Sequence, residues 1–184
     1  MTSGIQQRFN ERITKRYLAG EAIDLECDEE LARSIIQPAT GELRDFSNIS
    51  PEIPQLIPEA CTGCMECVTQ CPDTAILGKV AERSAIDETV RKNPALSSID
   101  LNSCFVKTRK YFEIFEKKGE TGGLFGIFIN PTKCKGCAEC VSVCGKRGAL
   151  KMIKKTPEQM EQYRNLWTLY KELPETPRKF IQEK

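Results

Sequence analysis

The chain has 184 residues, which fits one domain with appendages, and its 27 basic and 26 acidic side chains leave a formal charge of only +1. Ten cysteines occur without a single histidine, which removes the commonest general base and every metal site that needs an imidazole. The first residues are polar, and no secretion signal or membrane-spanning stretch is recognisable. We therefore expect a cytoplasmic protein whose thiols stay reduced.

Residues 1–50 are expected to form a helical extension and the approach to the core. Apolar side chains recur every four residues, at Ile5, Phe9, Ile13 and Tyr17. This spacing predicts an amphipathic helix that ends at Gly20. A second, short helix is predicted from Asp28, as its N-cap, to Ile35, before Pro38. Residues 51–58 (PEIPQLIP) are too rich in proline for a helix or a central strand, and predict an extended arm.

Two four-cysteine runs with the same internal spacing follow this arm. They are Cys61-x2-Cys64-x2-Cys67-x3-Cys71-Pro72 and Cys134-x2-Cys137-x2-Cys140-x3-Cys144. Each is the bacterial ferredoxin signature for a [4Fe–4S] cluster. Zinc knuckles would leave at least one cysteine of each run without a role, and a disulfide framework needs a secreted chain.

The ligands are expected to cross between the two runs. Three cysteines two residues apart can wrap three corners of a cubane cluster, whereas the fourth is already turning into the next element and reaches the other cluster. The predicted ligands are Cys61, Cys64, Cys67 and Cys144 for cluster I, and Cys134, Cys137, Cys140 and Cys71 for cluster II. Outside the runs, Cys27 and Cys104 are interpreted as buried small hydrophobes.

The predicted fold class is α+β, with a two-cluster ferredoxin-like core over residues 51–155. Residues 79–130 are expected to be a long insert between the motifs. It contains a predicted helix over residues 81–90, closed by Asn93-Pro94, and a hairpin that pairs residues 111–115 with residues 124–129 across a glycine-rich turn.

Residues 156–184 are predicted to be a C-terminal docking helix and tail. Thr156, Pro157 and Gln159 supply an N-cap, a first-turn proline and a capping-box partner, and Pro174 ends the helix. Its apolar stripe consists of Met160, Tyr163, Trp167 and Tyr170. The stripe either packs on the chain's own core or docks on another subunit, and the sequence favours neither.

Charge differs between the two motifs. Residues 133–155 carry seven basic side chains and one acid, whereas residues 51–78 carry four acids and no basic side chain. This contrast predicts docking to an acidic redox partner, and a higher reduction potential for cluster II, because a cation favours the reduced cluster. No motif for binding nucleic acid accompanies the lysines, so neither a nucleic acid nor a membrane is an expected partner.

Several segments resemble the ferredoxin-like domain of the 2-oxoacid:ferredoxin oxidoreductase family, including pyruvate:ferredoxin oxidoreductase. They are the approach segment 40–61, Ala75-Ile76 after the first run, Ile129-Asn130 at the end of the insert, Lys135-Gly136-Cys137 in the second run and Gly148-Ala149-Leu150 after it. The likeness covers roughly residues 40–152. Gly145 departs from the family by replacing the proline that commonly follows the fourth cysteine, and residues 1–40 have no recognisable counterpart.

The resemblance implies two [4Fe–4S] clusters, held by the eight cysteines of the runs, that relay electrons from a thiamine diphosphate site to ferredoxin or to an NAD(P)-linked flavin subunit. Nothing in this chain resembles the thiamine-binding parts, so the resemblance implies a non-catalytic subunit without catalytic residues of its own. Three alternatives remain open. The chain could be an electron-transfer subunit of another redox enzyme (a hydrogenase or an NAD(P)-linked reductase), a free carrier ferredoxin, or a binding module with structural clusters.

Overall fold

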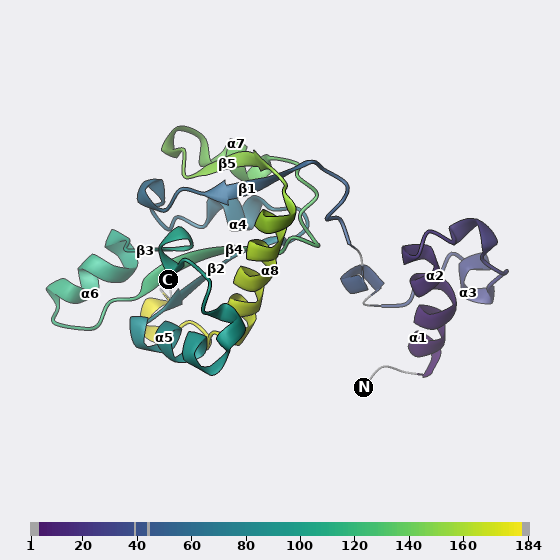
Figure 1. Ribbon diagram of the computed structural model, residues 1–184, viewed down its shortest axis with the longest axis horizontal. Coiled ribbons are helices and arrows are strands. Elements are labelled where there is room, and N and C mark those ends of the chain that lie inside the picture. Colours follow the sequence, from purple (N-terminus) through teal and green to yellow (C-terminus); the bar gives the residue numbers. More distant parts are fainter. Residues whose placement is uncertain (1–3, 39, 44, 182–184) are drawn as a thin grey trace. The chain divides into compact units, whose positions relative to one another are not determined.

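The computed structural model describes residues 4–38, 40–43 and 45–181, and the chain separates into two compact units, residues 1–45 and residues 46–184 (Figure 1). The second unit contains both cysteine runs and all the strands of the described chain. No helix in the described residues combines the length and the apolarity needed to cross a membrane.

The N-terminal unit contains the two predicted helices. α1 (Gly4–Phe9), a π-helical stretch (Asn10–Thr14) and α2 (Lys15–Leu18) follow one another, and Gly20 with φ +82° ends them. The Asp28 carboxylate caps α3 (Glu29–Ala32) by accepting from two backbone N–H groups. α3 stops short of the predicted Ile35, because Ser34 turns the chain with φ +59°. Short 3₁₀ turns cover 22–24 and 40–43.

Most apolar side chains of the N-terminal unit remain exposed. Among its described residues only Phe9, Ile13 and Thr14 are buried. The exposed large apolar side chains are Ile5, Tyr17, Leu18, Ile23, Leu31, Ile35 and Ile36. The predicted stripe is thus divided: its middle is buried and its ends face outward. Burial of apolar surface is the main stabilising term in folding, so this unit gains little of it on its own.

Two antiparallel sheets form the framework of the second unit. β1 (Glu52–Leu56) pairs with β5 (Leu150–Lys154), and β4 (Leu124–Ile129) lies between β2 (Ile76–Ala81) and β3 (Phe105–Val106). Part of the predicted insert is therefore the central strand of the larger sheet. The remaining described helical turns of this unit, outside the helices named below, cover 58–60, 94–96, 101–103, 145–147 and 178–180.

The proline-rich arm is an edge strand, which agrees with the predicted extended conformation. Ile57 N–H donates to Ala149 C=O (2.8 Å), and Lys155 N–H donates to Pro51 C=O (2.8 Å). These bonds place odd-numbered residues of β1 in the hydrogen-bonded pairs of the ladder. Pro54, opposite Met152, falls between them, so its missing N–H removes no bond between β1 and β5.

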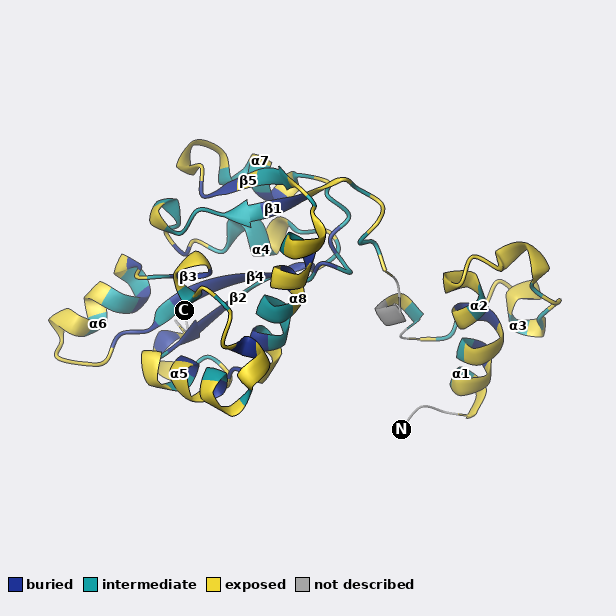
Figure 2. Cartoon of the chain, in the orientation of Figure 1, coloured by how far each residue is buried: buried dark blue, intermediate teal, exposed yellow. Residues whose placement is uncertain are grey.

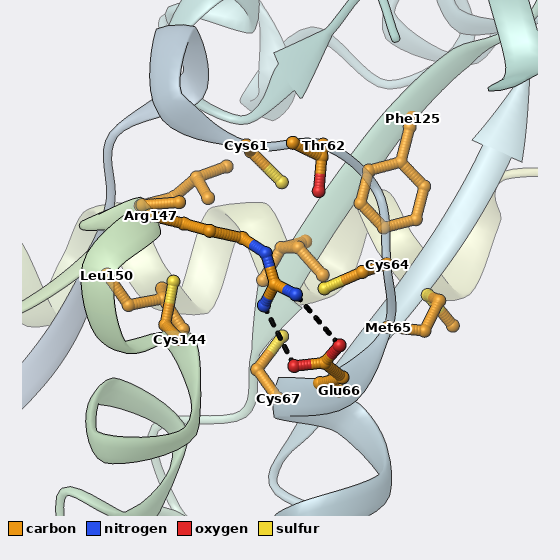
Figure 3. Close-up of a pocket in the computed structure, with 13 residues that line it drawn as sticks. Cys61, Thr62, Cys64, Met65, Glu66, Cys67, Phe125, Cys144, Arg147 and Leu150 are labelled. Atoms are coloured by element: carbon orange, nitrogen blue, oxygen red, sulfur yellow. Dashed lines mark hydrogen bonds and ion pairs between the residues drawn. The ribbon is translucent and has the colours of Figure 1, made fainter. Parts of the chain in front are cut away.

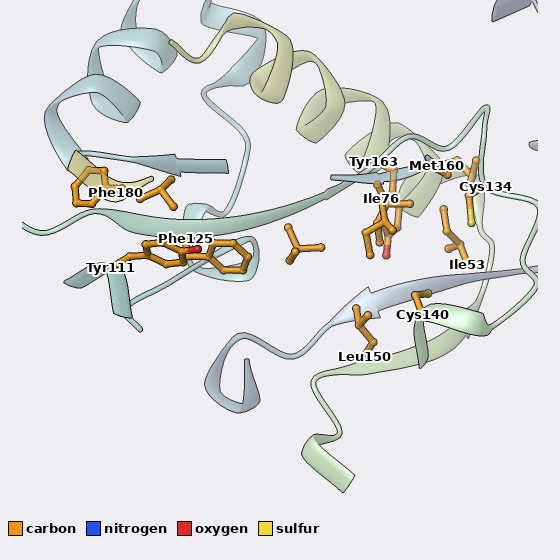
Figure 4. Close-up of a cluster of buried hydrophobic side chains, with 14 residues drawn as sticks. Ile53, Ile76, Tyr111, Phe125, Cys134, Cys140, Leu150, Met160, Tyr163 and Phe180 are labelled. Carbon is orange, nitrogen blue, oxygen red and sulfur yellow. The ribbon is translucent and has the colours of Figure 1, made fainter. Parts of the chain in front are cut away.

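The central sheet buries both of its faces. Phe125, Ile127 and Ile129 of β4 belong to a core that also contains buried residues of β1 and β5 (Figure 4). Phe128 points the other way, into a second core with Phe105 and Leu169. Successive residues of a strand face opposite sides, so one strand serves both cores. Figure 2 shows β4 as buried along most of its length.

The segment between β2 and β4 confirms one prediction and overturns another. α5 (Arg83–Lys92) is the predicted helix, and Asn93 and Pro94 close it. The predicted hairpin is wrong: residues 109–113 are π-helical and continue into α6 (Ile114–Lys117). Tyr111 and Phe115 both contribute to the first core, whereas Glu113, which would share their face in a strand, is exposed, as helical spacing requires.

α8 (Pro157–Glu172) has the predicted capping box at Thr156 and Gln159. Its apolar stripe packs within the chain: Met160 and Tyr163 are buried in the first core, while Trp167 and Tyr170 pack on the second. Of the two alternatives for this stripe, the structure shows packing on the chain's own core, and docking of the helix on another subunit stays a prediction.

A buried lysine closes the other end of α8. Lys79, only 7% exposed, donates from Nζ to Tyr170 C=O (3.0 Å) and Leu173 C=O (2.9 Å). The last carbonyl groups of a helix lack partners inside the helix, and this side chain supplies them from β2. Burial lowers the pKa of Lys79.

Candidate functional site

The cysteine runs belong to two similar halves of the second unit. The first half comprises β1, a loop, α4 (Glu66–Gln70) and β2; the second comprises β4, a loop, α7 (Glu139–Cys144) and β5. Each half gives a strand to both sheets, and α4 packs against α7. This exchange brings cysteines that are distant in sequence together.

Each loop turns twice into the left-handed region. Gly63 and Met65 have φ values of +72° and +68°, and Gly136 and Ala138 have φ values of +71° and +63°. The glycines lack room for a side chain: a Cβ at Gly63 would lie 3.2 Å from the Tyr111 ring, and a Cβ at Gly136 would collide with Ser50. These turns coil the loop so that its cysteine side chains face one pocket.

The first pocket gathers three cysteines of the first run and the last cysteine of the second. It is lined by Cys61, Cys64, Cys67 and Cys144, together with Leu56, Thr62, Met65, Glu66, Phe125, Ile127, Arg147, Ala149 and Leu150 (Figure 3). Cys64 is exposed, while the other three thiols are partly buried.

The second pocket has the complementary set. It is lined by Cys71, Cys134, Cys137 and Cys140, together with Pro54, Asp73, Ala75, Ile76, Ile129, Lys135, Gly136, Ala138 and Glu139. Cys137 is exposed, Cys71 is partly buried, and Cys134 and Cys140 are buried. All eight predicted ligands therefore line one of two pockets, in the grouping that crossed ligation requires.

The two pockets lie side by side between the sheets. Leu56 and Ile127 line the first, and Pro54 and Ile129, two positions away on the same strands, line the second. Residues two apart on a strand share a face and are about 7 Å apart. The two pockets are thus neighbours along one apolar face.

Burial favours the protonated form of four of these thiols when no metal is bound. It is the largest cause that raises the pKa of Cys67 and of Cys140, each to about 12, and neighbouring cysteines add to the effect. Burial also raises the pKa of Cys61 and Cys134. The backbone N–H groups of Gly63 and Gly136 lower these pKa values, but burial is the larger effect. Metal uptake must therefore displace protons.

The surroundings suit an iron–sulfur group. Thiolates are its ligands, backbone N–H groups stabilise its sulfur atoms, and apolar walls limit water. The N–H of Ala75 already donates to the Cys71 Sγ (3.2 Å), and apolar side chains form much of both linings. Among the described residues, no three Cys, Asp or Glu side chains have the geometry that holds a single metal ion.

Ion pairs join the basic and acidic segments across both pockets. Arg147 pairs with Glu66 (2.8 Å), and Lys135 pairs with Asp73 (2.8 Å). The predicted contrast of a positive second motif and a negative first motif is therefore wrong in space: each pocket receives charges of both signs. Sequence reasoning noted these four side chains but missed their pairing, because 81 residues separate Glu66 from Arg147.

Three further residues singled out in the sequence, Gly145, Cys104 and Cys27, differ in how they agree with the predictions. Gly145 has φ +52°, which a proline ring cannot adopt. The turn after Cys144 therefore has a conformation that the proline of the family pattern could not take. Cys104 is buried, as predicted, and burial raises its pKa to about 12. Cys27 is exposed, contrary to prediction, because it lies in the connection before α3.

Fold and site together define an iron–sulfur protein of the ferredoxin-like class. Models of the 4Fe-4S binding domain match residues 54–77 and residues 131–147, which cover the two cysteine runs. The predicted [4Fe–4S] chemistry and the electron-transfer role are thereby confirmed.

Three relatives narrow the class to a family. The chain is 29% identical over 139 residues to a pyruvate-flavodoxin oxidoreductase of Nostoc sp., which covers 72% of this chain and 10% of the relative. A probable pyruvate-flavodoxin oxidoreductase of Escherichia coli is 30% identical over 139 residues (71% and 10%). The pyruvate:ferredoxin oxidoreductase of Moorella thermoacetica is 32% identical over 110 residues (57% and 8%).

The chain is similar to a ferredoxin-like region of the 2-oxoacid oxidoreductase family, as the resemblance predicted. It spans about a tenth of the length of the curated relatives that it matches.

Proposed function

We propose that this chain is the electron-transfer subunit of a 2-oxoacid:acceptor oxidoreductase complex and that it holds two [4Fe–4S] clusters with crossed ligands. Cluster I is assigned to Cys61, Cys64, Cys67 and Cys144, and cluster II to Cys71, Cys134, Cys137 and Cys140. When bound, each cluster accepts and releases one electron at a time.

The observation that carries this proposal is the pair of neighbouring four-thiol pockets. The two cysteine quartets are displaced from each other by about two residues along the same strands, on one apolar face. Two clusters held there would be close enough to pass electrons to each other. The residues of the chain supply thiolates, exclude water with side chains such as Phe125 and Ile129, and direct backbone N–H groups at sulfur, as Ala75 does at Cys71.

The names of the relatives indicate the kind of enzyme with which this chain would work. The relatives are named as pyruvate oxidoreductases, and a tenth of their length corresponds to this chain. We assign the thiamine diphosphate chemistry to partner subunits, and we assign the exit of electrons to ferredoxin or to an NAD(P)-linked flavin subunit.

Two measurements on the native protein test the proposal. Iron and acid-labile sulfide are expected at about eight each per chain, which is two cubanes. Thiamine diphosphate-dependent subunits are expected to co-purify with the chain, and the isolated chain should not oxidise 2-oxoacids. Elution as a free monomer that carries both clusters would favour a carrier ferredoxin, and elution with a hydrogenase would favour the other redox complex.

The exposed apolar side chains of the N-terminal unit are assigned to contact with a catalytic subunit. Replacing Tyr17 and Ile23, which are 65% and 94% exposed, with serine is expected to weaken co-purification at least tenfold while iron content stays unchanged. Gel filtration of the complex at falling concentration measures the change.

The matched control is Ile181→Ser, because Ile181 is an exposed apolar residue (54%) outside this unit. It should leave assembly unchanged. Equal retention of the Tyr17/Ile23 variant and the control variant would move the contact away from the N-terminal unit.

A further inference from the structure

A two-point ion pair lies at the first pocket. Nη1 of Arg147 is 2.8 Å from Oε2 of Glu66, and Nη2 is 2.9 Å from Oε1. Both side chains line this pocket, and Figure 3 shows the guanidinium among the cysteine side chains that surround it. A fork of this kind fixes the orientation of a guanidinium as well as its position.

The ion pair connects the two halves of the core. Glu66 begins α4 directly before Cys67, and Arg147 ends the 3₁₀ turn that follows Cys144. Both backbones are therefore fixed next to cysteines of the same pocket. The pocket is open at Cys64, its one exposed thiol, and elsewhere its lining is largely apolar. The side chains of Arg147 and Glu66 are 39% and 45% exposed, so water screens part of their charge.

The positive end of the pair acts on the sulfur atoms. The hydrogen bond with Glu66, and then the charges of Cys64 and Cys144, raise the pKa of Arg147. Arg147 lowers the pKa of Glu66, to which the cysteines make no resolved contribution. The guanidinium thus carries the positive charge among the cysteine side chains, and the carboxylate both orients it and offsets part of its charge.

We propose that Arg147 is a positioning residue that keeps a fixed positive charge beside the group bound by Cys61, Cys64, Cys67 and Cys144, and so raises its reduction potential. This inference rests on the crossed ligation of the proposed function. Reduction adds one negative charge to a cluster, and a fixed cation stabilises that charge.

The second pocket lacks an equivalent arrangement. Lys135 contacts Asp73 (2.8 Å) through a single ammonium group, and Glu139 adds a second carboxylate to the lining. Formal charges at the linings therefore cancel at the first pocket and leave one negative charge at the second. Lys155, outside this lining, also acts on Cys134, so the inference concerns the effect of Arg147 on cluster I alone.

The test is an anaerobic redox titration of the full-length, cluster-containing protein, followed by EPR. Arg147→Gln should shift the one-electron equilibrium of cluster I about tenfold toward the oxidised form, which is about 59 mV. Glu66→Gln should shift it in the opposite direction, because it leaves the cation uncompensated. Arg147→Lys should retain part of the wild-type potential. Lys146→Gln, at an exposed neighbour that lines neither pocket, is the matched control.

The outcomes separate this inference from the proposed function. A wild-type iron content other than two cubanes per chain would contradict the proposed function itself. Two results would contradict the role of Arg147 in setting the potential and leave it a purely structural one. One is normal iron content with an unchanged potential in Arg147→Gln. The other is a shift of the same sign in Arg147→Gln and Glu66→Gln. If Arg147→Gln fails to take up iron, the sign of the Glu66→Gln shift decides.

Discussion

Replacing Cys71 with alanine is expected to remove cluster II and to spare cluster I. Cys71 follows the three cysteines of its own run, yet its side chain lines the second pocket with Cys134, Cys137 and Cys140. Iron should fall from about eight to about four atoms per chain, because a cubane that loses one of four thiolates is no longer fully held. Metal analysis and low-temperature EPR of the reduced protein measure the loss.

The reciprocal variant and a cysteine outside the pockets provide controls for Cys71→Ala. Cys144→Ala should remove cluster I instead, because Cys144 lines the first pocket. Cys27→Ala should change neither signal, since Cys27 is exposed and lines neither pocket. Loss of cluster I with retention of cluster II in Cys71→Ala would show that each run serves its own cluster.

Replacing Leu169 with alanine is expected to be strongly destabilising, by about 2–5 kcal/mol. Leu169 has no exposed surface, and it lies in the second core with Phe128 and Phe105. Truncation there leaves a cavity between α8 and the central sheet. A protein with bound clusters need not unfold in two states, so unfolding midpoints in urea should be compared at equal iron content.

Gln162→Ala is the control for Leu169→Ala because it makes an alanine at an exposed position of the same helix. Its effect should stay within about 0.5 kcal/mol. If Leu169→Ala left the unfolding midpoint unchanged but released the chain from its partners, α8 would be a docking element, and its packing against β4 would contribute little to stability.

Local patterns in the sequence were sufficient for much of the fold. The capping box of Thr156 and Gln159 predicted where α8 begins, and Asn93-Pro94 predicted where α5 ends. The cysteine spacing predicted eight thiols in two groups, and the structure gathers the same eight around two pockets. These signals are local because caps and cluster loops need particular residues within a few positions.

Features that depend on distant contacts were not predictable in the same way. Residues 111–115 are rich in aromatic and β-branched side chains and come before a glycine-rich turn, as in a hairpin, but the partners of β4 are β2 and β3, and helical packing places Tyr111 and Phe115 against the core. The charge of a segment likewise gave no information about Arg147 and Glu66, since the crossed fold places a basic residue that follows the second run at the first pocket.

Pro54 also shields the outer edge of β1. Between the hydrogen-bonded pairs of an antiparallel ladder, a residue turns its N–H and C=O away from the partner strand. Pro54 has no N–H, and its carbonyl oxygen already accepts a hydrogen bond from the Tyr163 hydroxyl (2.7 Å). A strand from another molecule would find neither donor nor acceptor at the middle of this edge. The small sheet can therefore end at β1 without serving as a template for edge-to-edge aggregation.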